Sequence, residues 1–240
     1  GKPMKGTRNT IVGVVAAATL SGLSASALAY EAGDVILRVG SATVDPNPGS
    51  GYLYADGVQA LPGDDLVDVS SNTQLGISVT YMATPNFGFE LLASTPFNHD
   101  LSAKGDLAAL GQTVGWDGNI GETTHLPPTL TLQWYPFASS SFQPYIGGGI
   151  NFTWFYDEKL SSSFTDNLGS SDSQFSLSNS FGLAGVIGAD LLFGDFLLNV
   201  SAMYADINTE AVIKGTALGD LVVDVDVNPW VYRVNLGYRF

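Results

Sequence analysis

Residues 230–240 read WVYRVNLGYRF, and this stretch decides the fold. Apolar or aromatic side chains stand at every second position from Tyr232 to Phe240, and polar, charged or glycine residues stand between them. A period of two is typical of a β-strand whose two faces meet different surroundings. Both arginines of the stretch fall on the polar face, so the other face can lie against a fully apolar medium.

The same alternation recurs along the chain, and we expect eight such strands. Their apolar faces are Val35-Leu37-Val39, Leu75-Ile77-Val79-Tyr81, Phe87-Phe89-Leu91-Ala93-Phe97, Leu130-Leu132-Trp134, Ile146-Ile150-Phe152-Trp154, Leu183-Ile187-Leu191, Leu198-Val200-Tyr204 and the stretch quoted above. Charged residues make up only 13% of the chain and the mean hydropathy is +0.18, values that are unusual for a soluble protein. We therefore predict an all-β, eight-stranded antiparallel transmembrane β-barrel.

The position of the charges tests which face meets lipid. A lysine or arginine that faces lipid at mid-depth costs about 2–4 kcal/mol. The predicted outer faces contain no charge, and the predicted lumen contains Arg38, Glu90, Asp190, Arg233 and Arg239, which can pair with one another there. The alternative is a secreted soluble barrel of lipocalin type with its apolar face inward. It predicts a charged outer face, whereas the polar positions here are mostly Gly, Ser, Ala and Thr.

Connection lengths alternate, which is typical of a barrel with short periplasmic turns and long extracellular loops. The predicted turns are residues 84–86, 136–141 and 194–195, and the predicted loops are residues 46–72, 100–124, 157–175 and 208–221. An even number of strands puts both chain ends on the short-turn side. The loops hold 14 of the 23 acidic residues, and they predict an acidic rim that keeps exposed loops solvated. Divalent cations that bridge this rim to lipid headgroups are an alternative use.

We expect residues 1–29 to be a signal peptide and residues 30–240 to be the barrel. Lys5 and Arg8 give a basic start, residues 11–23 are mostly apolar and small, and residues 27–29 form an A-x-A cleavage site. The three residues before the first methionine are interpreted as an expression scar or an early start. A transmembrane anchor is the alternative, but polar residues interrupt a run that is already shorter than the ~20 residues of a span.

Composition and motifs argue against several other functions. Nine basic against 23 acidic residues exclude a phosphate-backbone binder, and the absence of cysteine excludes disulfides. His99 and His125 are the two histidines, and no G-x-S-x-G or H-E-x-x-H segment is present. Metal-ligand spacing is also missing. We therefore expect no enzymatic activity, no cofactor and no metal site.

Several sequence blocks, in the same order, carry a resemblance to a known family. The blocks are residues 30–34 (YEAGD), 40–44 (GSATV), 72–76 (NTQLG), 94–99 (STPFNH), 126–130 (LPPTL) and 226–231 (DVNPWV). The chain resembles the OmpW-type outer-membrane proteins, and OprG-like members most closely. The resemblance implies a narrow barrel whose extracellular half is apolar and whose periplasmic end is closed. It also implies the outer membrane of a Gram-negative bacterium, with its lipids and lipopolysaccharide as partners.

The family further implies passive uptake of small, mainly hydrophobic molecules, with lateral release into the membrane through the barrel wall. Some close members are also linked to small amino acids. On the predicted inward face, Leu92 and Met203 are apolar exceptions among polar residues. They match positions that constrict the channel in the family, although Met203 replaces a bulkier aromatic residue of one relative. Packing of the barrel core is the simpler alternative for both.

Three prolines fall where the third and fourth strands are expected to pair. Pro96 interrupts the third strand, and Pro127 and Pro128 open the fourth. Proline cannot donate to a strand ladder, so the seam between these strands is weakened and becomes a candidate lateral gate. Alternatively, the prolines only end the strands before an external loop. The resemblance favours the gate, since Pro96 matches the family position associated with the lateral opening.

Two further groups of residues complete the prediction. Tyr52, Leu53, Tyr54 and Leu61 make the first loop more apolar than solvation requires, and we expect an entrance funnel, with loop self-packing as the alternative. Phe240, together with Tyr238, resembles the terminal assembly signal of bacterial outer-membrane barrels, which implies the barrel assembly machinery as a partner. A closed barrel has no free edge, so we expect a monomer.

Two function classes remain open. The first is the diffusion channel for small hydrophobic molecules. The second is an outer-membrane barrel without a transport role, which acts as an adhesin, a surface antigen or a structural protein related to lipid organisation or stress. Uptake of a small apolar solute separates the two.

Overall fold

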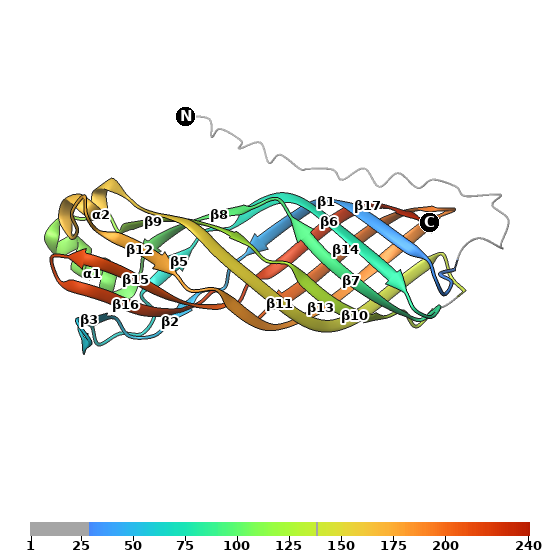
Figure 1. Ribbon diagram of the computed structural model, residues 1–240, viewed down its shortest axis with the longest axis horizontal. Helices are drawn as coiled ribbons and strands as arrows, with labels where there is room; N and C mark the ends of the chain where they lie inside the picture. Colours follow the sequence, from blue (N-terminus) through green and yellow to red (C-terminus); the bar gives the residue numbers. More distant parts are fainter. Residues whose placement is uncertain (1–28, 138) are drawn as a thin grey trace, which may run out of the picture.

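The computed structural model describes residues 29–137 and 139–240, and these form an elongated barrel with an ordered extension at one end (Figure 1). The predicted signal peptide, residues 1–29, lies almost wholly outside the described residues. Among the described residues, no helix combines the length and the apolar character needed to cross a membrane.

Eight antiparallel strands close the barrel, as predicted. They are β1 (Val35–Asp45), β6 (Asn72–Met82), β7 (Phe87–Ser94), β10 (Thr129–Trp134), β11 (Phe142–Leu160), β13 (Ser180–Phe193), β14 (Phe196–Ala205) and β17 (Trp230–Arg239). Each strand pairs with the next along the chain, and β17 pairs with β1. The closed ring leaves no unpaired edge in the barrel wall.

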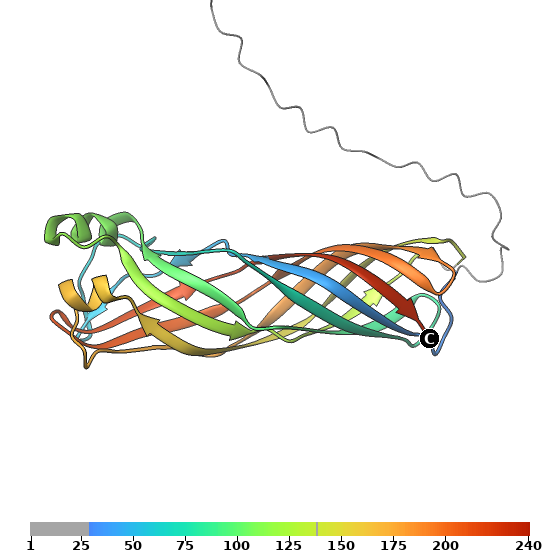
Figure 2. The same ribbon diagram turned by 90° about the horizontal axis from the view of Figure 1, so that it is seen from above.

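Both the start of β1 and the end of β17 lie at the end of the barrel with short turns (Figures 1 and 2). The connections at this end are residues 83–86, 135–141 and 194–195. The amide of Phe240 donates to the carbonyl of Val35, and the amide of Val35 donates back to Phe240. The last residue of the chain therefore takes part in closing the ring.

The outer face of the barrel is a belt of exposed apolar side chains. Ile77, Leu91, Leu132, Val200 and Val234 are each between 41% and 56% exposed, as are most of the other residues predicted to face outward. An outward-facing band of exposed apolar side chains is typical of a barrel surface that contacts membrane lipid.

Phe97 was predicted to belong to this outer face, and that prediction is wrong. Its side chain is only 1% exposed. The bend at Thr95 and Pro96 ends β7, and Phe97 begins a new strand with its side chain inward. A break of this kind resets which residues face the lumen, so the alternation cannot be extended across it.

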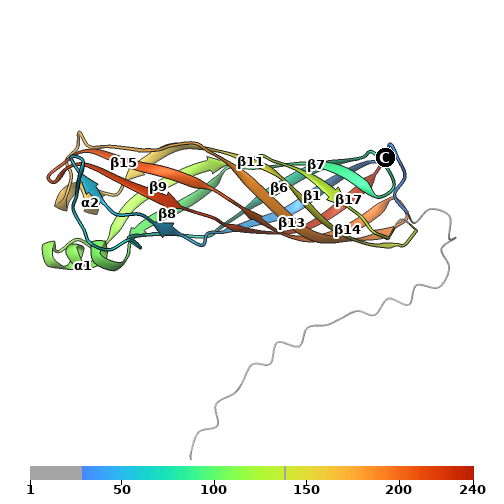
Figure 3. The ribbon, with the colours of Figure 1, turned by 90° about the horizontal axis from the view of Figure 1, so that it is seen from below.

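The segments predicted to be long loops form an ordered extension instead. One sheet joins β5 (Val67–Val69), β8 (Phe97–Ala103), β9 (Asn119–Leu126) and the far end of β11. A second sheet joins β12 (Gln174–Leu177), β15 (Asn208–Thr216), β16 (Gly219–Asp226), β2 (Gly49–Ser50), β3 (Tyr54–Ala55) and β4 (Val58–Gln59). The helices α1 (Gly105–Val114) and α2 (Ser162–Asn167) cover the tip (Figures 1 and 3).

The extension is ordered because it has its own apolar interior. Along β16, Leu221, Val223 and Val225 alternate with exposed or half-buried residues and point inward. Ala211 and Ile213 do the same on β15. The outward positions of β8 and β9, such as Asp100 and Glu122, are polar, so the extension lies beyond the lipid-facing belt.

Candidate lumen path and lateral seam

Four charged residues fill the lumen on the short-turn side of the barrel. In Arg38, Nη1 lies 2.9 Å from Glu90 Oε2 and Nη2 lies 2.5 Å from Asp190 Oδ2. In Arg233, Nη2 lies 2.8 Å from the other carboxylate oxygen of Glu90. All four side chains are at most 3% exposed. Each charge thus has an opposite charge beside it, as buried ions require.

Neutral groups use most of the remaining hydrogen-bonding capacity of the two carboxylates. The donors are Ser78 Oγ and Gln133 Nε2 to Glu90, and Tyr30 OH and Asn199 Nδ2 to Asp190. The network draws side chains from β1, β6, β7, β10, β13, β14 and β17. At this level the lumen is filled, as expected for a ring of eight strands.

Arg239 lies apart from this charge network, unlike the other charges predicted for the lumen. Its Nη2 is 3.1 Å from Asp195 Oδ1, and its Nη1 is 4.0 Å from Asp34 Oδ2. These groups surround the mouth of the barrel at the short-turn end. The alternation sets the direction of Arg239 but not its depth, and as the second-last residue it reaches only the mouth.

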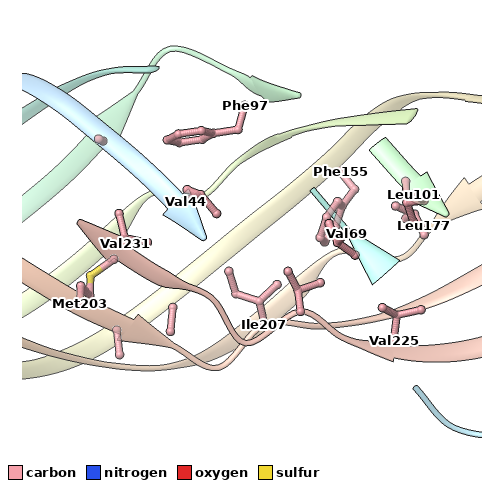
Figure 4. Packing of buried hydrophobic residues seen from close by; sticks show 14 of the residues in the cluster. Val44, Val69, Phe97, Leu101, Phe155, Leu177, Met203, Ile207, Val225 and Val231 are labelled. Carbon is pink, nitrogen blue, oxygen red and sulfur yellow. The ribbon is translucent and has the colours of Figure 1, made fainter. Parts of the chain in front are cut away.

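A small apolar cavity lies next to the charge network, on the side of the extension. Both Leu92 and Met203 line it. Each follows a polar lumen residue by two positions along its strand, Glu90 on β7 and Ser201 on β14. Figure 4 shows Met203 beside Val231, its ladder partner on β17. The two residues predicted to form the constriction therefore share one cavity, which we call the upper lumen cavity.

A larger apolar cavity occupies the extension. Its walls are Leu53, Val67, Leu101, Leu107, Ile120, Phe164, Leu168, Phe175, Ala211, Ile213, Leu218, Leu221, Val223 and Val225. Val69 and Phe155 are buried in the same apolar cluster as Ile207, which lies on the wall of the upper lumen cavity (Figure 4). We call the two cavities and the apolar side chains packed between them the apolar column.

The four residues of the predicted entrance funnel take different positions relative to this column. Leu53 is 4% exposed and lines the extension cavity, whereas Tyr52 and Tyr54 on either side of it are exposed. Leu61 is half-buried and packs against the apolar cluster. Neighbouring residues of an extended chain point to opposite sides, so three consecutive apolar residues cannot all face one cavity. The remaining wall residues come from β-strands and helices that the sequence reading treated as loop.

The ladder between the third and fourth barrel strands is interrupted, and we call the interruption the seam. Pairing of β7 with β10 ends at Leu92 and Thr129, and pairing of β8 with β9 begins at Phe97 and His125. Residues 93–96 and 126–128 lie between these points without ladder partners across the seam. Each side of the seam is instead bonded to its other neighbour, β6 or β11.

The three prolines differ in how they lie relative to the seam and to the neighbouring strands β6 and β11. Thr95 donates its amide to Leu75 on β6, and Pro128 accepts from Phe152 on β11. Pro96 lies in the bend that ends β7 and Pro127 follows the end of β9, so both lie within the seam. Both positions lack a hydrogen to donate. Pro127 also lines the upper lumen cavity.

The two histidines, His99 and His125, form a buried pair just beyond the seam. The Nε2 atoms of His99 on β8 and His125 on β9 are 2.8 Å apart, and His99 Nδ1 is 2.5 Å from the carbonyl oxygen of Ser70. A carbonyl only accepts, so His99 carries its hydrogen on Nδ1, and His125 must donate from Nε2 to the free Nε2 of His99. The Nδ1 of His125 is then an unprotonated acceptor. The spacing of both histidines from the prolines, three and two residues, was the available signal.

Protonation of this pair should destabilise the extension. Burial lowers the pKa of His125 from 6.5 to about 3, with a smaller contribution from His99, and burial also lowers the pKa of His99 against the opposing influence of Ser70 and Asp100. The unfolded chain therefore binds more protons than the folded chain between these pH values. The contribution of the neutral pair to the free energy of unfolding is fully present above about pH 6.5. It is lost, by on the order of a few kcal/mol, as the pH falls toward 3.

Hydrogen exchange of the β8 and β9 amides, measured between pH 7 and pH 4 and corrected for the intrinsic pH dependence of exchange, tests this expectation. Protection should fall with pH in the native chain and should fall less in His125→Phe, which cannot titrate at that position. Equal pH dependence in both chains would show that the pair does not control the stability of this region.

The terminal aromatic residues lie on the outside of the short-turn end. Phe240 is 69% exposed, and its ring centroid is 4.8 Å from that of Tyr238, which in turn is 4.9 Å from Phe196. Among the described residues, no group of three or more His, Cys, Asp or Glu side chains is placed to hold a metal ion.

Comparison with known proteins covers nearly the whole chain. The model of the OmpW family matches residues 31–240. Outer membrane protein W of Vibrio cholerae serotype O1 is 42% identical over 235 residues, which span 97% of this chain and 100% of the relative, and its Escherichia coli K12 counterpart is 43% identical over 234 residues, spanning 95% and 98%. The crystal structure of OprG from Pseudomonas aeruginosa is similar with a TM-score of 0.78 and 40% identity, covering 89% and 98% of the two chains. The matches include the barrel and the extension together.

Proposed function

The chain belongs to the OmpW family of outer-membrane proteins, and on that premise we propose that it is a channel for the passive uptake of small, mainly hydrophobic molecules. The barrel lies in the outer membrane of a Gram-negative bacterium, with the extension on the extracellular side and the short turns in the periplasm. In the proposed route, a solute enters the extension, descends the apolar column and leaves sideways through the seam into the membrane.

The apolar column supports the first part of this route. A solute that moves from water into a site lined by aliphatic and aromatic side chains gains about 25 cal/mol for each Å² of apolar surface that it buries. The extension cavity offers such a lining along its whole wall. Water-soluble molecules gain nothing from it, so the column selects for apolar solutes.

One observation carries the second part, which is lateral release. The upper lumen cavity lies beside the charge network on one side and borders the seam on another, since Ser94 and Pro127 belong to both the cavity wall and the seam. The direct way to the periplasm would need the paired charges to separate, which is costly in a buried site. Separation of the seam breaks no ladder hydrogen bond between the two strands. The seam is therefore the easier exit.

The test is uptake of radiolabelled toluene into vesicles whose outer leaflet contains lipopolysaccharide, which slows diffusion of apolar solutes through the lipid itself. Vesicles with the protein should take up toluene faster than empty vesicles. The double variant Pro96→Ala and Pro127→Ala gains two donors at the seam. If these donors form one or two ladder bonds, each worth about 1 kcal/mol, the open seam becomes about five to thirty times rarer and uptake falls accordingly.

Pro128→Ala is the matched control, because this residue faces β11 and not the seam. It should leave uptake unchanged. Equal uptake in the control and the double variant would contradict the lateral gate and would leave the channel proposal standing. Equal uptake with and without the protein would remove the channel, and the barrel would then act as an adhesin, a surface antigen or a structural protein.

The remaining partners belong to the same proposal. The exposed belt places outer-membrane lipids around the barrel, and we propose lipopolysaccharide beside the extension and a monomeric barrel, since the ring has no free edge. We also propose that Phe240 and Tyr238 are read by the barrel assembly machinery. The proposal assigns no chemical reaction to the chain, and small hydrophobic solutes are its cargo.

A further inference from the structure

Two buried polar atoms without a hydrogen-bonding partner lie on residues that line the upper lumen cavity. Among the described residues, the buried side-chain atoms in this condition are Ser94 Oγ, His125 Nδ1 and Gln143 Oε1. Ser94 and His125 both line the cavity. Buried polar side-chain atoms are rarely left unpaired, so two of them on one small cavity require an explanation.

The third polar residue of the cavity wall behaves differently. Asn151 donates from Nδ2 to Thr129 Oγ1 at 2.9 Å, and its Oδ1 accepts from Thr153 Oγ1 at 2.7 Å. Its amide is therefore occupied by the protein itself. The remaining wall is apolar, and Leu92, Met203 and Val231 belong to it. Unused polar capacity on this wall is thus confined to Ser94 and His125.

The chemistry of the two atoms is complementary. His125 is 1% exposed, and the hydrogen-bond chain through His99 to the Ser70 carbonyl holds its Nδ1 as an acceptor. The hydroxyl of Ser94 can donate as well as accept. The two residues stand on opposite sides of the seam, Ser94 at the end of β7 and His125 near the end of β9. Both residues line the same cavity, and a hydroxyl group has the two functions that their free atoms need: it donates to an acceptor such as His125 Nδ1 and accepts from a donor such as Ser94 Oγ.

We propose that Ser94 and His125 form a polar subsite in the upper lumen cavity that binds the hydroxyl group of a small, otherwise apolar solute, a compact alcohol or phenol. This inference rests on the proposed function and names the solute class within it. The apolar wall holds the hydrocarbon body, and the subsite holds the hydroxyl group beside the seam. A pure hydrocarbon fits the same wall but leaves both polar atoms unpaired, so the site favours the hydroxylated solute.

The test compares phenol with toluene, which differ by a hydroxyl in place of a methyl group. Both affinities are measured by NMR titration of the full barrel in lipid nanodiscs. The ratio of phenol to toluene affinity should fall about fivefold in Ser94→Ala and by about fivefold or more in His125→Phe, with toluene binding retained. Ser41→Ala, which removes an exposed hydroxyl from the outer face, should leave the ratio unchanged.

A second measurement does not depend on any variant folding. Phenol should shift the resonance of the unprotonated His125 Nδ1 in the native chain, and toluene should not. An unchanged affinity ratio in Ser94→Ala together with an unshifted Nδ1 resonance would overturn the subsite, and the two atoms would then hold only a water molecule. If toluene is still taken up, that result removes the subsite and leaves the channel, whereas absence of toluene uptake removes the channel itself.

Discussion

Replacement of Arg38 by methionine will lower the free energy of unfolding of the barrel by about 3–5 kcal/mol, because it leaves buried charges without their partner. Asp190 loses the guanidinium that contacts both of its oxygens, and Arg233 is then the one charged partner that Glu90 retains in the network. Methionine keeps an unbranched, largely apolar chain at this position and lacks the guanidinium, so the variant removes the charge together with its hydrogen bonds.

Urea unfolding in phospholipid vesicles, followed by tryptophan fluorescence, measures this effect. The double variant Arg38→Met with Asp190→Asn removes both charges of the pair and should recover part of the stability. Lys104→Met is the matched control, since Lys104 pairs with Asp65 at 3.1 Å on the exposed extension and such pairs contribute about 0–1 kcal/mol. Equal losses in the two single variants would mean that the buried network does not stabilise the barrel.

Replacement of Met203 by tryptophan will reduce toluene uptake about tenfold or more. Met203 is 3% exposed on the wall of the upper lumen cavity, and the indole ring is larger than the flexible thioether chain. The ring occupies the space through which the solute must pass to reach the seam. Overfilling a packed site costs about 1–3 kcal/mol, and each 1.4 kcal/mol added to the barrier slows passage tenfold.

Val200→Trp is the matched control on the same strand. Val200 is 51% exposed on the outer face, so tryptophan there contacts lipid and leaves the lumen unchanged. Initial rates of uptake into vesicles with equal amounts of folded protein make the comparison. A Met203→Trp rate equal to that of Val200→Trp would place the solute path elsewhere.

The barrel could be predicted from the sequence because the two faces of each strand meet different surroundings. Lipid on one side and a narrow lumen on the other impose an alternation that each strand carries within itself, as at Leu75 to Tyr81. The inward direction of Arg38, Glu90, Asp190 and Arg233 follows from the same alternation. No knowledge of the neighbouring strands is needed for either inference.

The extension escaped prediction because its order depends on contacts between distant segments. Leu53, Phe164 and Leu221 line one cavity although they are far apart in the sequence. The inward turn of Phe97 depends on how the bend at Pro96 resets the strand, and the depth of Arg239 depends on the length of the barrel. A periodic pattern predicts only whether a side chain points inward or outward. The depth of a residue and its contacts with distant segments depend on the three-dimensional structure.

The histidine pair was missed for a similar reason. His99 and His125 are 26 residues apart, and their contact depends on the register of β8 with β9. The sequence shows that each histidine lies within three residues of a proline, Pro96 or Pro127. That spacing does not fix the register of two strands across the seam. The polar subsite on the cavity wall follows from the tautomer that the Ser70 carbonyl imposes, which only the fold reveals.

The closed charge network allows a cell to carry many copies of this barrel without becoming leaky. Ions, sugars and water-soluble poisons meet a lumen that is sealed by side chains with almost no exposed surface. A wide pore would force the cell to trade nutrient supply against resistance to toxins, and this architecture avoids that conflict.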